Sequence, residues 1–220
     1  MEVMEAAGPE SWRRLCSETF VPPLETVADT DFVGRIEHVQ MGGVTISRVT
    51  CGPCVVGRSR RAIRSAPRSD VLFNVVDRGS TLLSTSRTAS VLDAGHAALC
   101  AADTEYGLGM QAPAVVLTLQ LDRSLLPIAD DRIHAAHADP LRSTARVAVL
   151  RHFMHGVLAG SALGEDHSMP YGSSRGTCCC WRSTSTTRPR TSSPTRIRRS
   201  SWCEHISSVI SRTRTSRSTR

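Results

Sequence analysis

The chain has 220 residues, of which 40% are hydrophobic and 4% aromatic, and its formal net charge is +7. This length allows one domain, or one and a half. No apolar run approaches the roughly 20 residues of a membrane-spanning helix, and the acidic start MEVMEAAGPES lacks the basic and apolar parts of a signal peptide. We therefore expect a cytoplasmic protein with no membrane partner, whose eight cysteines are free thiols.

Residues 1–30 are expected to form an N-terminal helix and a lead-in to the next segment. The helix is predicted over residues 9–20, because Pro9 suits a first helical turn and apolar side chains recur at helical spacing. Those side chains are Trp12, Leu15, Cys16 and Phe20. The sequence Val21-Pro22-Pro23 then ends the helix.

Residues 31–128 read as a series of short strands separated by Gly, Pro, Asp and Asn. The candidates are residues 32–39, 44–49, 54–56, 70–76, 80–84, 89–92, 97–100 and 114–121, followed by a helical turn at 123–126. Such close spacing of strands, about 8–12 residues, favours an antiparallel sandwich or barrel over a parallel sheet. The expected fold class is therefore mainly β with flanking helices (α+β).

Residues 129–170 are expected to be helical. The segment 139–160 predicts one amphipathic helix with a common apolar face. The residues of that face are Leu141, Ala145, Ala148, Val149, Phe153 and Val157.

Residues 171–220 differ from everything before them. They contain 11 Arg, 13 Ser and 9 Thr but one acidic residue, whereas residues 1–170 contain 16 Arg and 19 acidic residues. A segment this polar is expected to be disordered; alternatively, its Arg side chains could bind nucleic acid. The chain has 27 Arg and no Lys, which is typical of a GC-rich gene, and out-of-frame GC-rich DNA encodes such a composition. We therefore hypothesise that the reading frame is lost near residues 170–172, which the nucleotide sequence will test.

The motif Cys51-Gly52-Pro53-Cys54 has the residue types of a thioredoxin-like redox site. That chemistry needs a helix after the motif, whereas the residues that follow it here have the pattern of a strand. The alternative is a Gly-Pro turn between two strands, with the thiols acting as small apolar side chains.

Histidine pairs could in principle hold a metal ion. His134 with His137 and His152 with His155 have spacings that place both imidazoles on one helix face, but a zinc site needs three or four converging ligands. The β region contributes two histidines, His38 and His96, which is too few for a cupin-type metal site. We therefore assign no catalytic, metal or cofactor residue.

An arginine cluster could bind an anionic ligand or an acidic partner. Its members are Arg58, Arg60, Arg61, Arg64 and Arg68. Strand alternation predicts that Arg58 and Arg60 share one face. The alternative is an edge strand that its charges protect from aggregation.

The order of these segments resembles the N-terminal regulatory domain of AraC/XylS-family transcription activators, in the branch with a cupin-like β-sandwich. The resemblance covers about residues 10–160. It rests on Gly52, Pro53, Val56, Arg58 and Ser59, on the turn at Arg78-Gly79, and on Gly95. Gly79 and Gly95 suit hairpin positions with positive φ. The turn Ala94-Gly95-His96 departs from the Pro-Gly-Asp that is usual there.

This resemblance implies a regulatory domain with a small-molecule effector inside the β-sandwich and helices that help to form a homodimer. It assigns no effector-binding residue. Sequence-specific DNA binding is expected of a complete regulator but not of this chain, because no segment resembles the helix-turn-helix units of the family. Residues 205–220 read two bases later can give ADPDLAVD, which resembles the start of that DNA-binding part. The alternatives are a cupin-like enzyme or binding protein, and a nucleic-acid-binding protein that uses residues 171–220.

Overall fold

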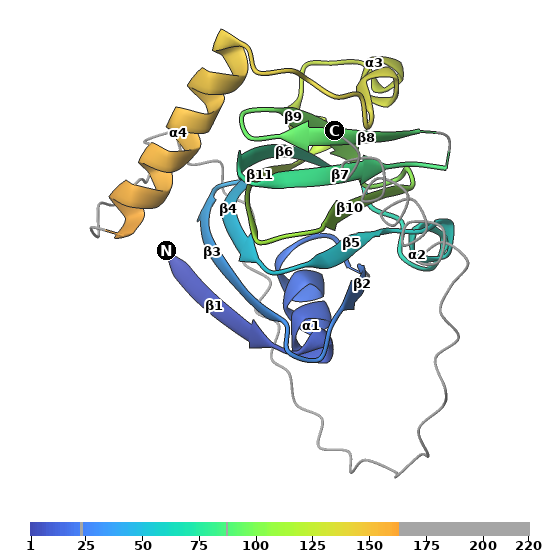
Figure 1. Cartoon of the computed structure of the whole chain (residues 1–220). Coiled ribbons are helices and arrows are strands. Elements are labelled where there is room, and N and C mark those ends of the chain that lie inside the picture. Colours follow the sequence, from blue (N-terminus) through green and yellow to red (C-terminus); the bar gives the residue numbers. More distant parts are fainter. Residues whose placement is uncertain (23, 87, 163–220) are drawn as a thin grey trace, which may run out of the picture.

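Two antiparallel sheets stack face to face and form the body of the protein (Figure 1). The computed structural model describes residues 1–22, 24–86 and 88–162. One sheet has six strands in the order β1-β3-β4-β11-β6-β9, and the other has five in the order β2-β5-β10-β7-β8. All pairings within the two sheets are antiparallel. The predicted class, mainly β in a cupin-like antiparallel sandwich with flanking helices, is confirmed.

The elements have the following bounds. The six-stranded sheet contains β1 (Glu2–Ala7), β3 (Val33–Met41), β4 (Val44–Cys51), β11 (Ala114–Asp122), β6 (Asp70–Arg78) and β9 (Ala97–Ala101). The five-stranded sheet contains β2 (Glu25–Ala28), β5 (Cys54–Arg58), β10 (Tyr106–Met110), β7 (Ser80–Ser84) and β8 (Ala89–Asp93). The helices are α1 (Pro9–Thr19), α2 (Arg60–Ser65), the 3-10 turn η1 (Arg123–Leu125), α3 (Asp130–Ala136) and α4 (Ala145–Ala162).

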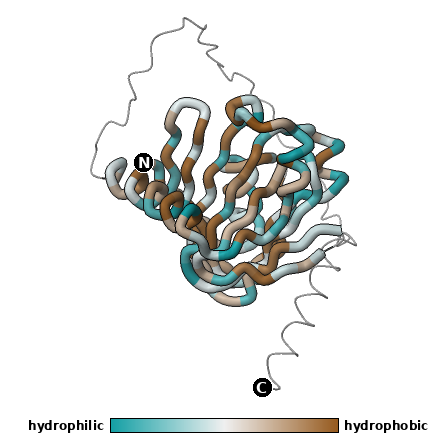
Figure 2. Tube along the Cα trace, turned by 90° about the horizontal axis from the view of Figure 1, so that it is seen from above, coloured by the Kyte–Doolittle hydropathy of each residue, from teal (hydrophilic) through white to brown (hydrophobic). Residues whose placement is uncertain are grey.

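The six-stranded sheet buries its inner face and, beneath α4, part of its outer face, whereas Val33, Arg35 and Thr50 on the outer face are exposed. On β4 and β11, Val49 and Val116 point toward the other sheet, while Ile46 and Leu117 point toward α4. Figure 2 shows hydrophobic stretches through the middle of the strands and hydrophilic ones mostly at bends. Beneath α4, the alternation that predicted these strands therefore separates two buried layers rather than a buried layer and a wet one.

Helix α1 packs against β1 and β2 at one end of the sandwich (Figure 1). It has Pro9 in its first turn and buries Trp12, Leu15 and Cys16, as predicted. Gly34 on β3 makes this contact possible, because a Cβ atom there would lie 2.7 Å from the Trp12 ring. Gly79 and Gly95 have φ angles of 77° and 86°, which confirms the predicted positive φ at both turns.

Helix α4 covers the outer face of the six-stranded sheet, but its buried face is not the predicted one. It buries Val147, Met154, Val157 and Leu158, of which the prediction contained Val157. The predicted members Val149 and Phe153 are 70% and 53% exposed. Apolar side chains occur on every side of the helix, so hydrophobic periodicity does not determine which side packs.

The helix also begins six residues later than predicted, at Ala145. The residues before it continue the sheet instead, since Leu141 exchanges two backbone hydrogen bonds with Ala97 of β9, at 2.8 and 2.9 Å. The Thr144 hydroxyl then accepts a hydrogen bond from the Val147 amide and caps the helix.

Strands β1, β2 and β10 and helix α2 were not predicted, whereas α3 lies within residues 129–170, which were expected to be helical. β1 has one β-branched residue, β2 has only four residues, and two glycines interrupt β10. None of the helices in the described ranges is long and apolar enough to cross a membrane. The predictions of disorder, frame loss and nucleic-acid binding for residues 171–220 lie outside the described residues.

Candidate functional site

A cavity of about 60 Å³ lies between the two sheets. One wall is formed by α1 and by Phe20 and Leu24, which follow it, and the other walls are formed by strands of both sheets. The lining residues are Trp12, Cys16, Phe20, Leu24, Val49, Val56, Leu72, Asn74, Tyr106, Leu108, Met110, Val116 and Thr118. Two larger hollows, of about 590 and 490 Å³, are wide and open to solvent. Because the interior cavity removes a bound molecule from water, we consider it the best candidate site.

A row of polar side chains crosses the inner face of the six-stranded sheet beside this cavity. His38, Ser47, Thr118 and Asn74 are direct register neighbours on β3, β4, β11 and β6, so they point to the same side. Ser47, Thr118 and Asn74 are 1%, 3% and 3% exposed. Buried polar groups inside a sandwich need hydrogen-bond partners.

The polar row is only partly satisfied. The Thr118 hydroxyl donates to Oδ1 of Asn74 at 2.9 Å. Within the described part of the chain, no oxygen or nitrogen hydrogen-bond partner is found for the Asn74 Nδ2, the Ser47 Oγ or the His38 Nδ1. The Cys100 thiol lies beside Asn74, but sulfur is a weak hydrogen-bond acceptor. Burial raises the pKa of Cys100 to about 12, although a hydrogen bond from Asn74 lowers it. Of the three unpaired groups, Asn74 lines the cavity.

The cysteine motif forms a turn between two strands. Cys51 ends β4, Cys54 begins β5, and Gly52-Pro53 connect them, so no helix follows the motif. A hydrogen bond with Cys51 and burial raise the pKa of the Cys54 thiol far above its usual value. The structure thus agrees with the interpretation of these residues as a Gly-Pro turn with apolar thiols, because both thiols are buried and the motif does not lie at a helix N-terminus.

The histidines bond to separate partners. His134 pairs with Asp103 and His155 with Asp77, while His152 bonds to the carbonyl of Ala148. The His137 ring bonds to the Ala101 amide and the Glu105 carbonyl. Within the described ranges, His, Cys, Asp and Glu side chains form no group of three or more that could hold a metal ion.

The prediction that Arg58 and Arg60 share one face of a strand is wrong. β5 ends at Arg58, and Ser59 caps the next helix by accepting a hydrogen bond from the Ala62 amide, so Arg60 begins α2. The alternative of a charged edge strand is wrong as well, because β5 lies between β2 and β10. The other arginines of the cluster, Arg60, Arg61, Arg64 and Arg68, are exposed.

Arg58 is fully buried and binds backbone carbonyls. Its guanidinium donates to Ala102 at 2.8 Å, to Val21 at 3.2 Å, to Pro22 at 2.9 Å and to Ala66 at 2.7 Å. Burial lowers the pKa of Arg58. This residue therefore holds the lead-in, the residues after α2 and the end of β9 together, and it does not present its charge to a ligand.

A second polar cluster attaches α4 to the outer face of the six-stranded sheet. The Asp77 carboxylate accepts from Arg151 Nε at 2.7 Å and from His155 Nε2 at 2.8 Å. The His155 Nδ1 lies 3.0 Å from Arg48 Nη2 and must be the acceptor, since a guanidinium only donates. Burial alone would raise the pKa of Asp77, but these hydrogen bonds hold it below its usual value.

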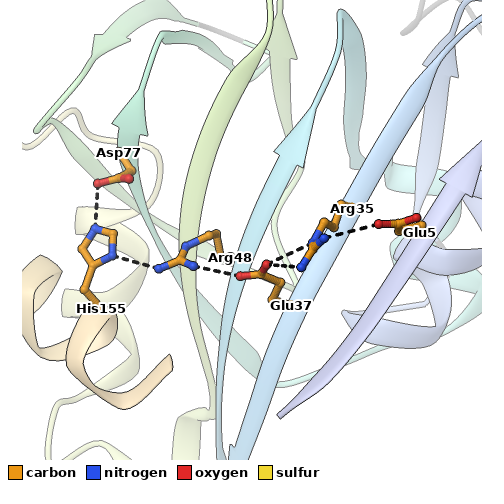
Figure 3. Close-up of polar contacts among 6 residues, drawn as sticks. All are labelled: Glu5, Arg35, Glu37, Arg48, Asp77 and His155. Atoms are coloured by element: carbon orange, nitrogen blue, oxygen red, sulfur yellow. Dashed lines mark hydrogen bonds and ion pairs between the residues drawn. The ribbon is translucent and has the colours of Figure 1, made fainter. Parts of the chain in front are cut away.

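The ion pairs continue from α4 across the sheet to its first strand (Figure 3). Arg48 Nη1 lies 2.8 Å from Glu37, which pairs with Arg35 at 2.7 Å, and Arg35 reaches Glu5 of β1 at 3.4 Å. We call the set Asp77, Arg151, His155 and Arg48 the α4 anchor. Its charged groups all have partners, so it acts as an attachment rather than as an open binding site.

Comparisons with known proteins find one domain family and several solved structures that this chain resembles. A family described as the AraC-binding-like domain matches residues 12–170. A search of curated proteins finds no match. A solved structure of the AraC-like transcriptional activator CuxR superposes with a TM-score of 0.60 at 18% identity, over 73% of this chain and 62% of the activator. The chain thus spans less than two thirds of that activator.

More distant structures share parts of the sandwich. A cupin-like protein from Thermotoga maritima gives a TM-score of 0.35 at 12% identity, over 50% of this chain and 91% of that protein. A cupin domain of an XRE family transcriptional regulator from Enterobacter cloacae gives 0.34 at 9% identity, over 40% and 95%.

Proposed function

Because this chain belongs to the AraC-binding-like domain family, we propose that it is the effector-sensing and dimerising part of a transcription regulator. The observation that carries the sensing role is the interior cavity, which is lined by Asn74, a buried amide whose Nδ2 has no oxygen or nitrogen acceptor among the described residues. Small-molecule sites are concave, mainly apolar and equipped with a few polar groups that orient the ligand. The cavity beside Asn74 meets these three conditions.

The position of the cavity supports a regulatory role. Its wall contains Trp12, Cys16 and Phe20 of the α1 segment, and the opposite face of the same sheet carries α4. A molecule in the cavity thus contacts a sheet whose other side holds the last described helix. Binding there can bias the packing of α4, which is the kind of differential contact that a ligand-controlled switch needs.

The sensing role can be tested with a library of metabolites and a matched pair of variants. Val116 faces the cavity, whereas Val115 is its neighbour on the opposite face of β11. We expect a specific metabolite to raise the Tm of the protein and of Val115→Phe by about 4 °C or more at saturation. The same compound should not stabilise Val116→Phe, whose larger side chain fills the cavity. Equal stabilisation of both variants, or no stabilising compound, would contradict the proposal.

We further propose that the exposed face of α4 forms a homodimer. Val149 and Phe153 stand next to each other on this face, and Gly156 has open space where a side chain would begin. Exposed large apolar side chains on adjacent helical turns are typical of a contact surface. Two copies related by a two-fold axis would cover both of these residues.

Dimerisation is tested by sedimentation velocity of Phe153→Glu beside the control Ala159→Glu, which lies at the margin of the exposed face. We expect the wild type and the control to sediment as dimers and Phe153→Glu as a monomer. A monomeric wild type would contradict this part of the proposal.

We assign the sequence-specific DNA binding of a complete regulator to a part other than residues 1–162. Residues 1–162 contain 17 acidic residues and 16 arginines, so this part of the chain has no excess of positive charge for contact with phosphates. A fragment of residues 1–162 is expected to show no sequence-selective shift of operator DNA at physiological salt. Nanomolar, selective binding by this fragment would contradict the assignment.

A further inference from the structure

We infer that the cavity takes a compact, uncharged molecule with one hydrogen-bond acceptor, which Asn74 binds through its side-chain amide. This inference rests on the proposed sensing function and specifies the chemical class of the effector. Short-chain ketones, aldehydes and alcohols belong to this class.

The lining excludes an ionic ligand. None of the side chains around the cavity is charged. Arg58 is buried and lies two residues after Val56, which lines the cavity. Its guanidinium donates hydrogen bonds to the carbonyls of Val21, Pro22, Ala66 and Ala102. An ion placed in the cavity would lose its hydration without meeting an opposite charge, which is strongly unfavourable.

The hydrogen bonding of Asn74 determines which polar group the ligand needs. Its Oδ1 already accepts a hydrogen bond from Thr118, so the atom of the amide that most needs a partner is Nδ2. Its Nδ2 is buried and has no oxygen or nitrogen acceptor among the described residues, and the Cys100 thiol beside it is only a weak acceptor. A carbonyl or hydroxyl oxygen at this position would accept the hydrogen bond that the protein leaves open, whereas a ligand group that only donates would not.

The volume of the cavity limits the size of the ligand. A cavity of about 60 Å³ has room for roughly four to six water-sized groups. The walls of this cavity are the closely packed side chains of α1 and of both sheets, which resist expansion. The preferred ligand therefore has about four to six non-hydrogen atoms, which excludes sugars and nucleotides.

The inference can be tested with acetone and isobutene, which have nearly the same shape and differ in an oxygen against a CH₂ group. Binding is followed by the methyl NMR signals of Met110, Leu108 and Val116, which line the cavity. We expect acetone to bind the full-length protein about tenfold more tightly than isobutene, because isobutene leaves the Asn74 donor unpaired.

Two variants assign this preference to Asn74. In Asn74→Ala the preference for acetone should disappear, since the donor is absent. In the control Ser47→Ala it should persist, because Ser47 belongs to the same polar row but does not line the cavity. Circular dichroism shows whether both variants are folded. Equal binding of the two probes by the wild type, an unchanged preference in Asn74→Ala, or no binding of either probe would overturn the inference.

The experiments distinguish a failure of the inferred ligand class from a failure of the proposed sensing function. If Val116→Phe abolishes the binding of a charged metabolite, the cavity senses an effector but the inferred class is wrong. If acetone is preferred through Asn74 and no metabolite binds, the chemical preference of the cavity is correct and the sensing role fails.

Discussion

The inner and outer faces of the six-stranded sheet bury polar groups in opposite ways. On the outer face, the buried carboxylate of Asp77 accepts from both Arg151 and His155. On the inner face, Asn74 and Ser47 are just as buried, yet each has a polar atom without a partner. The comparison separates two uses of a buried polar group: paired groups attach one element to another, whereas unpaired groups beside a cavity offer a bond to a ligand.

The largest expected effect concerns apolar packing on the two faces. Leu117 is fully buried under α4, and Leu117→Ala should lower the free energy of unfolding by about 3 kcal/mol. Val116→Ala, one residue away on the cavity side, should cost about 1 kcal/mol, because less surface is lost and a void already exists there. Urea unfolding measures both values. Similar losses would mean that the two faces are equally well packed.

The next effect is the pH dependence of the α4 anchor. Hydrogen bonds from His155 and Arg151 hold the pKa of Asp77 below its usual value, although burial opposes this shift. The stabilisation is therefore fully present above the pKa of the unfolded chain, near pH 4, and is lost as pH falls through the lower pKa of the folded state. Asp77→Asn should cost about 2 kcal/mol at pH 7.

The Asp77→Asn variant should also have a flatter profile of stability below pH 4 than the wild type. The control is Asp139→Asn, which removes an exposed carboxylate outside the anchor. Chemical unfolding between pH 2 and pH 7 gives both profiles. If the two variants show the same profile, Asp77 does not provide the anchor's pH dependence.

A smaller effect is expected when the polar pair on the inner face is removed. Replacing both Asn74 and Thr118, as Asn74→Leu with Thr118→Val, should change the free energy of unfolding by less than about 1 kcal/mol. The reason is that neither residue then leaves a buried partner behind. A large loss of stability would show instead that the inner polar row is structural, which would remove its contrast with the α4 anchor.

The smallest expected effect is the reaction of the buried thiols with a thiol reagent. Cys16, Cys51, Cys54 and Cys100 are all buried, and burial raises the pKa of Cys16 and brings that of Cys100 to about 12. In a variant with Cys178, Cys179, Cys180 and Cys203 replaced by serine, the native protein at pH 8 should show almost no reaction. The unfolded chain should react with four equivalents of the reagent, one for each remaining thiol. Rapid reaction of one native thiol would indicate that the cavity side of the sandwich opens readily.

Much of this fold could be predicted because the strands have regular alternation and the turns contain Gly, Pro, Asn and Asp. The range 80–84 coincides with β7, and residues 114–121 lie within β11. The fold class and the domain resemblance follow from this pattern. The strand β10 was missed because glycines at two of its five positions remove the alternation on one face.

The candidate site was harder to predict, because it depends on register between strands that are distant in sequence. Asn74 and Thr118 interrupt two apolar strands at inward positions, which is a signal that a polar pair lies inside. Their pairing across 44 residues, and the cavity beside them, require the positions of both sheets and of α1. Likewise, the alternation of Cys54, Val56 and Arg58 pointed Arg58 inward, but its charge favoured a surface position.

The carbonyl contacts of Arg58 have a consequence for local opening. One guanidinium donates to three segments that are far apart in sequence: Val21 and Pro22 after α1, Ala66 directly after α2, and Ala102 directly after β9. If one segment moves away, it leaves a buried cation with fewer acceptors, so the three segments should open together rather than one at a time. In amide hydrogen exchange they form a single cooperative unit, whose protection reports the stability of the whole end of the sandwich.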